Sequence, residues 1–168
     1  NKLAYHIGAG VGVPYGNSDY LPFERAYFSG GANSVRGWSV RELGPGGMSK
    51  DSIFSYALQC GDIRLDLNVE YRTKLFWKFE LAAYVDAGNV WLLKDDPMRP
   101  GAALSSHFFK DLALGTGVGV RFDMGMLVVR GDLGIGLHLP YTTPHKGYFN
   151  VGKFSDSLAF NLAIGYPF

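Results

Sequence analysis

The fold is indicated most clearly by residues 62–72, which read DIRLDLNVEYR. Hydrophobic side chains occupy every second position of this stretch: Ile63, Leu65, Leu67, Val69 and Tyr71. Charged or amide side chains fill the positions between them: Asp62, Arg64, Asp66, Asn68, Glu70 and Arg72. Because successive side chains of a β-strand point to opposite faces, this period of two predicts a strand with one apolar and one polar face.

Five further segments keep the same period less strictly. Their apolar faces fall at alternate positions within residues 3–13, 81–85, 112–122, 127–139 and 158–168. The expected connections alternate between long (about 14–61, 92–111 and 140–157) and short (about 73–78 and 123–126). Bacterial outer-membrane barrels combine short periplasmic turns with long external loops. The pattern therefore predicts six antiparallel strands of a transmembrane β-barrel, with the chain ending on the periplasmic side.

Composition supports this all-β interpretation and argues against several other classes. The 168 residues include 23 glycines and 47% hydrophobic residues, yet mean hydropathy is only +0.01, as alternating strands would give. No apolar run approaches the roughly 20 residues of a membrane helix. The net charge of +1 gives no electrostatic case for nucleic acid. One cysteine and four scattered histidines provide no disulfide and no metal-ligand spacing, and no GxSxG elbow is present. We expect no metal, no cofactor and no enzymatic activity.

A soluble β-sandwich or lipocalin-like barrel is the main alternative, since its strands also alternate. In those folds the apolar face forms the core and the polar face meets water. Here the polar face of the last strands is rich in glycine, at Gly115, Gly117, Gly119, Gly134 and Gly136. Glycine weakens a strand, so a solvated outer face would rarely carry so many. On the inside of a barrel these glycines would leave room for a packed segment.

The most specific signal is residues 28–38, FSGGANSVRGW. It resembles the Gly-Gly…Val-Arg-Gly-aromatic motif of the BamA/TamA superfamily of outer-membrane protein assembly and translocation factors. The motif residues here are Gly30, Gly31, Val35, Arg36, Gly37 and Trp38. In that family the motif lies in the sixth extracellular loop, which folds back into the barrel lumen. The resemblance thus implies an inward-folded loop at about residues 14–61, and residues 39–46, SVRELGPG, favour the TamA-like branch.

The resemblance extends over the whole chain, residues 1–168, as the final six of about sixteen strands. It implies that the other barrel strands and the periplasmic domains lie elsewhere, because about eight strands is the smallest membrane barrel. Residues 65–72 and 84–91 resemble the two strands that carry the family's lumen-facing acids, here Glu70 and Asp86. The planar guanidinium of Arg36 suits carboxylates. We expect it to form a latch with both acids.

The end of the chain resembles the signal by which outer-membrane barrels are recognised for insertion. Its residues are Leu162, Ile164, Gly165, Tyr166 and Phe168, on a strand expected to run to the last residue. Pro167 cannot donate to a strand ladder, which predicts a weakly paired seam between the last and first strands. Phe76, Trp77, Trp91 and Tyr166 are expected in the aromatic girdles at the two membrane interfaces.

The function implied by the resemblance is insertion or translocation of client proteins in the Gram-negative outer membrane. The partners implied are the lipid bilayer and client outer-membrane proteins. A weak seam could open laterally and template a client strand by β-augmentation. Three alternatives remain: a two-partner-secretion transporter of the same superfamily, a passive porin, and a barrel that anchors a fused hydrolase.

Overall fold

The computed structural model describes residues 1–48 and 58–168 and places six strands in them. The strands are β1 (Lys2–Val11), β2 (Ile63–Phe76), β3 (Phe79–Trp91), β4 (Ala113–Asp123), β5 (Val128–His138) and β6 (Leu158–Ile164). The short 3-10 helices η3 (Phe108–Lys110) and η4 (Phe154–Ser157) lie in the connections. Among the described residues, no helix is long and apolar enough to cross a membrane.

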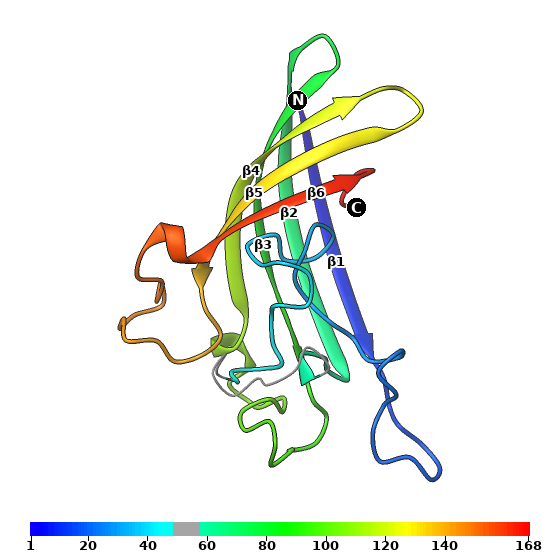
Figure 1. Cartoon of the computed structure of the whole chain (residues 1–168), viewed down its shortest axis with the longest axis vertical. Helices are drawn as coiled ribbons and strands as arrows, with labels where there is room; N and C mark the ends of the chain where they lie inside the picture. The colour runs from blue at the N-terminus through cyan, green and yellow to red at the C-terminus, as the bar shows by residue number, and fades with distance from the viewer. Residues whose placement is uncertain (49–57) are drawn as a thin grey trace.

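The strands form one antiparallel sheet in sequence order, β1 to β6, which confirms the predicted fold class. Figure 1 shows this sheet as a curved wall with tight turns at one end and long connections at the other. Within the described residues β1 pairs with β2 alone and β6 with β5 alone, so the wall is open between its edge strands. That further strands outside this chain close the barrel remains a prediction.

The two faces of the sheet reverse the arrangement of a soluble core. The inner face of β2 buries polar side chains: Asp66, Asn68, Glu70 and Arg72. The outer face is apolar and accessible, with Val69 and Tyr71 49% and 47% exposed. On β1 the outward side chains Leu3, Tyr5 and Ile7 are more exposed still. An exposed apolar face of this extent is typical of a surface that meets lipid.

Residues 28–48, called the inner loop below, lie on the concave side of the sheet (Figure 1). They are held at their base by isolated bridges between Tyr27 and Gly61 and between Ser29 and Leu43. Val35, Arg36 and Leu43 are almost completely buried. The inner face of the sheet therefore packs against the chain's own loop.

Two expectations about strand ends were wrong. The last strand ends at Ile164, because Gly165 adopts a φ of +96° and turns the final three residues away from the ladder. Trp91 is only 1% exposed, because the connection that follows β3 covers it and Phe108 packs edge-on at 6.3 Å. Phe76 and Trp77, at the tight turn between β2 and β3, are 65% and 78% exposed, as a girdle position requires.

Candidate functional site

The centre of the inner face is occupied by Arg36, whose side chain has no exposed surface. Its guanidinium donates from Nε to Asp86 Oδ2 (2.7 Å), from a second nitrogen to Asp86 Oδ1 (2.8 Å), and from the third to Glu70. The Arg36 backbone N–H also donates to Asp86, at 3.1 Å. The structure thus brings together Arg36, Glu70 and Asp86, called the Arg36 cluster below. The bidentate contact with Asp86 is the geometry in which a guanidinium binds a carboxylate most strongly.

The Arg36 cluster belongs to a larger ionic network on the inner face. Glu70 also accepts from Arg72 (2.5 Å) and Arg121 (2.8 Å), and Asp132 accepts from Arg121 (2.6 Å) and Arg130 (2.8 Å). All of these side chains are nine-tenths buried or more. Glu70 and Asp132 therefore each have at least two cationic donors, and Asp86 has the bidentate contact with Arg36. This pairing offsets the cost of removing the carboxylates from water.

The ring of Tyr84 lies directly under the guanidinium of Arg36, 3.5 Å from the ring centroid. Both are buried, so the cation–π contact is not weakened by competing water. Burial alone would lower the pKa of Arg36, but the hydrogen bonds and charges of Asp86 and Glu70 raise it above its ordinary value. These contacts therefore favour the charged form, which arginine keeps in proteins in any case.

A second set of contacts fixes the start of the inner loop. Ser34 Oγ donates to Asp66 on β2 at 2.7 Å and lies 3.0 Å from Ser29 Oγ. Asn68, on the same strand, donates to the carbonyl of Ser34 at 2.8 Å. These bonds anchor the backbone two residues before Arg36, so the arginine enters the cluster from a fixed position.

The glycine-rich inner face of β4 and β5 receives the other side of the loop. A Cβ on Gly134 would overlap the carbonyl of Arg36, and one on Gly136 would lie 3.1 Å from the Trp38 ring. Gly37 is held equally close, with the β5 backbone 3.1 Å from the position of its missing Cβ. The glycines of the two segments therefore let the two backbones touch.

Hydrophobic packing completes the site. Val35, Trp38, Leu43 and Ala113 form one buried cluster, with Leu139 packed against it. Gly30 and Gly31 have φ angles of +97° and +92°, a conformation that disfavours side chains, and both lie against the backbone of residues 38–40. The six motif residues therefore all lie in, or directly shape, the contact between loop and sheet.

Comparison with protein-family models adds the decisive observation: the model of the Omp85 superfamily domain matches residues 1–168. The chain belongs to the Omp85 superfamily. No curated protein matches it. Omp85 proteins are outer-membrane β-barrel proteins that act in protein insertion or transport, and the BamA/TamA resemblance is consistent with this family. The match does not separate a TamA-like branch from the others, so that preference stays a prediction.

The predicted end signal of this Omp85 chain divides into two parts. Leu162 and Ile164 lie on β6 with 71% and 76% of their surface exposed on the apolar outer face. Beyond Gly165, the ring of Tyr166 lies 4.5 Å from the Arg72 guanidinium carbon. Phe168 stacks on His6 with ring centroids 5.4 Å apart. The last two aromatic residues therefore contact inner-face residues of β1 and β2, so the expected girdle position of Tyr166 was wrong.

Sequence reasoning missed four participants: Tyr84, Arg121, Arg130 and Asp132. The sequence did contain a signal for these four residues, because each lies at a position of β3, β4 or β5 whose side chain points to the inner face. Family motifs point only to Glu70 and Asp86, whereas the strand register places Arg121 opposite Arg130 and Asp132 opposite Asn161. Strand pairing, which cannot be read from the sequence alone, brings these polar residues close enough to form a network.

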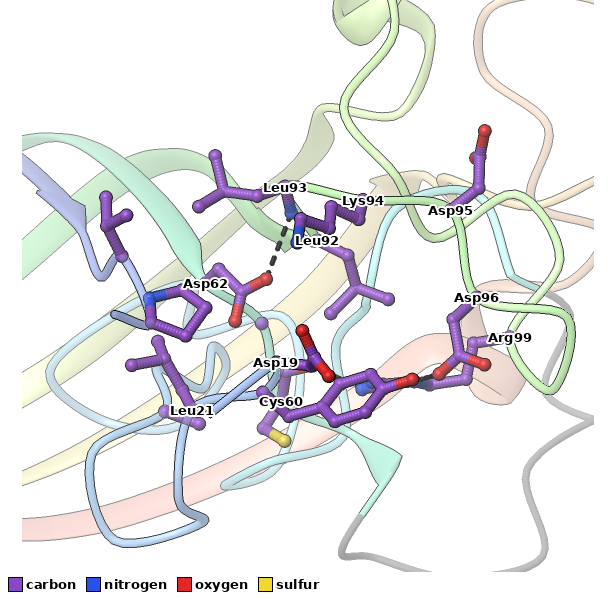
Figure 2. Close-up of a pocket in the computed structure, with 15 residues that line it drawn as sticks. Asp19, Leu21, Cys60, Asp62, Leu92, Leu93, Lys94, Asp95, Asp96 and Arg99 are labelled. Carbon is purple, nitrogen blue, oxygen red and sulfur yellow. Dashed lines mark hydrogen bonds and ion pairs between the residues drawn. The ribbon is translucent and has the colours of Figure 1, made fainter. Parts of the chain in front are cut away.

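A separate hollow lies among the long connections of this Omp85 chain (Figure 2). Asp62 accepts from the backbone N–H of Leu93 at 3.0 Å, and Arg99 donates to Asp96 at 2.8 Å and to the Cys60 carbonyl at 3.3 Å. Burial raises the pKa of the Cys60 thiol. In residues 1–48 and 58–168, no group of three or more His, Cys, Asp or Glu is placed to hold a metal ion. The hydrogen bonds named here connect one long connection of the chain with another.

Proposed function

We propose that this chain is the C-terminal part of the barrel of a Gram-negative outer-membrane protein insertion or translocation factor that works without catalysis or cofactor. The inward-folded loop predicted at about residues 14–61 is represented by the inner loop, residues 28–48, while residues 49–57 lie outside the described residues. Arg36, Glu70 and Asp86 form a latch that holds the inner loop in the lumen. The observation that supports the proposal best is the fully buried Arg36, paired with acids on two neighbouring strands.

The latch supports a protein-handling function over passive conduction. A loop packed on the inner wall occupies the space that a porin would keep open for water. Burying a cation, two carboxylates and the polar atoms around them is costly unless all are paired, and pairing here holds the loop in one position. We infer that the fixed loop shapes the barrel wall on which clients are inserted or exported.

A weak seam is the second part of the proposal. β6 has seven residues, against eleven in its neighbour β5, and pairs only from Leu158 to Ile164. Its outer edge has unpaired backbone groups within the described chain, and an edge of this kind can accept another strand. We propose that a client strand, or the first strand of the barrel, pairs there. The bilayer and unfolded outer-membrane proteins are then the partners.

The test uses the full-length protein reconstituted in lipid vesicles, with an unfolded outer-membrane protein as client. Arg36→Ala should slow client folding about tenfold or more, because it removes every side-chain contact of the latch. Arg25→Ala is the matched control, since Arg25 is an exposed arginine of the same connection. Full client insertion by Arg36→Ala would contradict the proposal. Export of a soluble client without vesicle insertion would instead favour the two-partner-secretion alternative.

A further inference from the structure

Asn161 joins the last strand to the inner loop. It lies on β6, is 7% exposed, and donates from Nδ2 to the backbone carbonyl of Arg36 at 3.0 Å. Arg36 in turn donates from its backbone N–H to Asp86 on β3 and from its guanidinium to Glu70 on β2. Arg36 therefore connects an edge strand with two strands on the far side of the inner face.

A second connection starts beyond the end of β6. The turn at Gly165 brings Tyr166 over the guanidinium of Arg72, 4.5 Å from the ring centroid, and Phe168 lies 5.9 Å from the same group. Phe168 is also 6.0 Å from the guanidinium of Arg36. Arg72 donates at 2.5 Å to Glu70, the acid that Arg36 shares. The segment after β6 thus contacts the guanidinium of Arg72, which in turn binds Glu70 of the Arg36 cluster.

These two connections have a physical consequence for movement of β6. If β6 separates from the loop, the buried carbonyl of Arg36 loses its donor, and an unpaired buried acceptor is costly. If the loop leaves the inner face, Asn161 loses its acceptor, Phe168 loses its contact with the guanidinium of Arg36, and Glu70 loses one of the donors that it shares with Arg72. Each movement therefore makes the other easier.

We propose that Asn161, assisted by the contact between Arg72 and Tyr166, is a positioning residue that couples the last strand to the latched loop. Release of the inner loop and loosening of β6 are then energetically coupled, so that each favours the other. The coupling is a property of the barrel itself, while its meaning as control of a seam rests on the proposed function. Coupling between two sites is reciprocal, so it can be measured from either side.

The first measurement follows the loop. In full-length protein in vesicles, with Cys60→Ser and any other native cysteine replaced, Val35→Cys is a reporter at a position with no exposed surface. A membrane-impermeant maleimide should label it slowly. Asn161→Leu should raise the rate about threefold to tenfold, the effect of one net hydrogen bond. Asn150→Leu is the control, because Asn150 is equally buried and bonds to Leu139 and Tyr141 rather than to the inner loop.

The second measurement follows the strand. Hydrogen exchange of backbone amides in residues 158–164 should speed up in Arg36→Ala by a similar factor. Tyr166→Leu should raise labelling of the loop reporter, whereas Tyr166→Phe should not, since it keeps the ring over Arg72. Unchanged labelling in Asn161→Leu, or unchanged exchange of β6 in Arg36→Ala, would overturn the coupling.

A folding control keeps the test decisive. Heat-dependent gel mobility shows whether each variant forms a barrel, and Asn161→Gln supplies a second variant that keeps a donor and should label more slowly than Asn161→Leu. No client enters either measurement. A coupled barrel that fails to insert clients would therefore contradict the proposed function and leave the coupling intact, and an uncoupled barrel that inserts them would do the reverse.

Discussion

The two halves of the inner face hold Arg36 by different means. On β2 and β3 the loop meets charged side chains, and Arg36 reaches Glu70 and Asp86 through its guanidinium. On β4 and β5 the contacts nearest Arg36 are with glycine backbone, and the carbonyl of Arg36 lies where a Cβ of Gly134 would be. The charged side chain there that reaches the loop is Arg130, which donates to the carbonyl of Ala32 at 2.8 Å and to Asn33. Around Arg36 itself, β2 and β3 (the charged half) supply side-chain bonds, and β4 and β5 (the glycine half) supply space.

This difference explains how Arg36 is held from two sides. Charges alone would tolerate a displaced arginine, because a guanidinium can reach carboxylates in several ways. A glycine surface alone would attract no particular residue. Together they fix both ends of Arg36, its side chain on one half and its carbonyl on the other. Substitutions in the two halves should therefore release the loop for different reasons, by loss of bonds in one half and by steric overlap in the other. The labelling rate of the loop reporter Val35→Cys measures both effects on one scale.

The largest effect is expected from Asp86→Ala in the charged half. It removes three of the bonds made by Arg36 and leaves a buried cation with Glu70 as its remaining acid. Breaking a fully buried pair costs about 3–5 kcal/mol, and access of water to the lumen reduces that value. We expect loop opening to become easier by about 2 kcal/mol, or about thirtyfold in labelling rate. A rate equal to that of the parent would show that Asp86 does not hold the loop.

In the glycine half, Gly134→Ala should have the next largest effect. The added methyl group would overlap the carbonyl of Arg36, which is rigid backbone and not a flexible side-chain end. Overpacking of this kind costs about 1–3 kcal/mol. Gly131→Ala is the control on the same strand, because its added Cβ would meet only the Phe160 ring, at 3.7 Å. Equal labelling rates in the two alanine variants would mean that the loop does not touch β5.

Arg36→Lys should be intermediate, since it keeps the charge and loses the fork. A lysine ammonium cannot reproduce the bidentate bond to Asp86 while also reaching Glu70. We expect labelling about tenfold faster than in the parent and slower than in Arg36→Ala. If Arg36→Lys matched the parent in both labelling and client insertion, charge alone would account for the latch.

The smallest effects should come from Tyr84. Its hydroxyl has no hydrogen-bond partner within the described part of the chain, while its ring lies 3.5 Å from the guanidinium of Arg36. Tyr84→Phe should therefore leave loop labelling unchanged within about twofold. Tyr84→Leu removes the ring and should cost about 0.5–2 kcal/mol. A large effect of Tyr84→Phe would reveal a role for the hydroxyl that these contacts do not show.

The strands were predictable because a two-residue period is a local property. Residues 62–72 alternate in the structure as their sequence predicts, and β2 simply continues to Phe76. The final strand was predicted too long, because the period of two runs on through Tyr166 and Phe168 while the turn at Gly165 depends on a backbone angle. Trp91 was misplaced for a related reason, since only tertiary contact with Phe108 shows that it is covered.

The site was predictable only where a motif pointed to it. Arg36, Glu70 and Asp86 came from resemblance to a family, and the glycines of β4 and β5 from their unusual place on a polar face. Asn161 carried no such signal, because an asparagine in an alternating strand is ordinary. Its bond to Arg36 joins residues 125 positions apart and appears only when the strands are assembled.

The most direct test of the account is an experimental structure of the full-length protein in a lipid environment. We expect Arg36 to lie inside the barrel, with its guanidinium within about 3.2 Å of carboxylate oxygens of both Glu70 and Asp86. We also expect the Arg36 carbonyl to contact Gly134 and to accept a hydrogen bond from Asn161. An inner loop turned outward, with Arg36 in solvent and beyond hydrogen-bond distance of both acids, would contradict it.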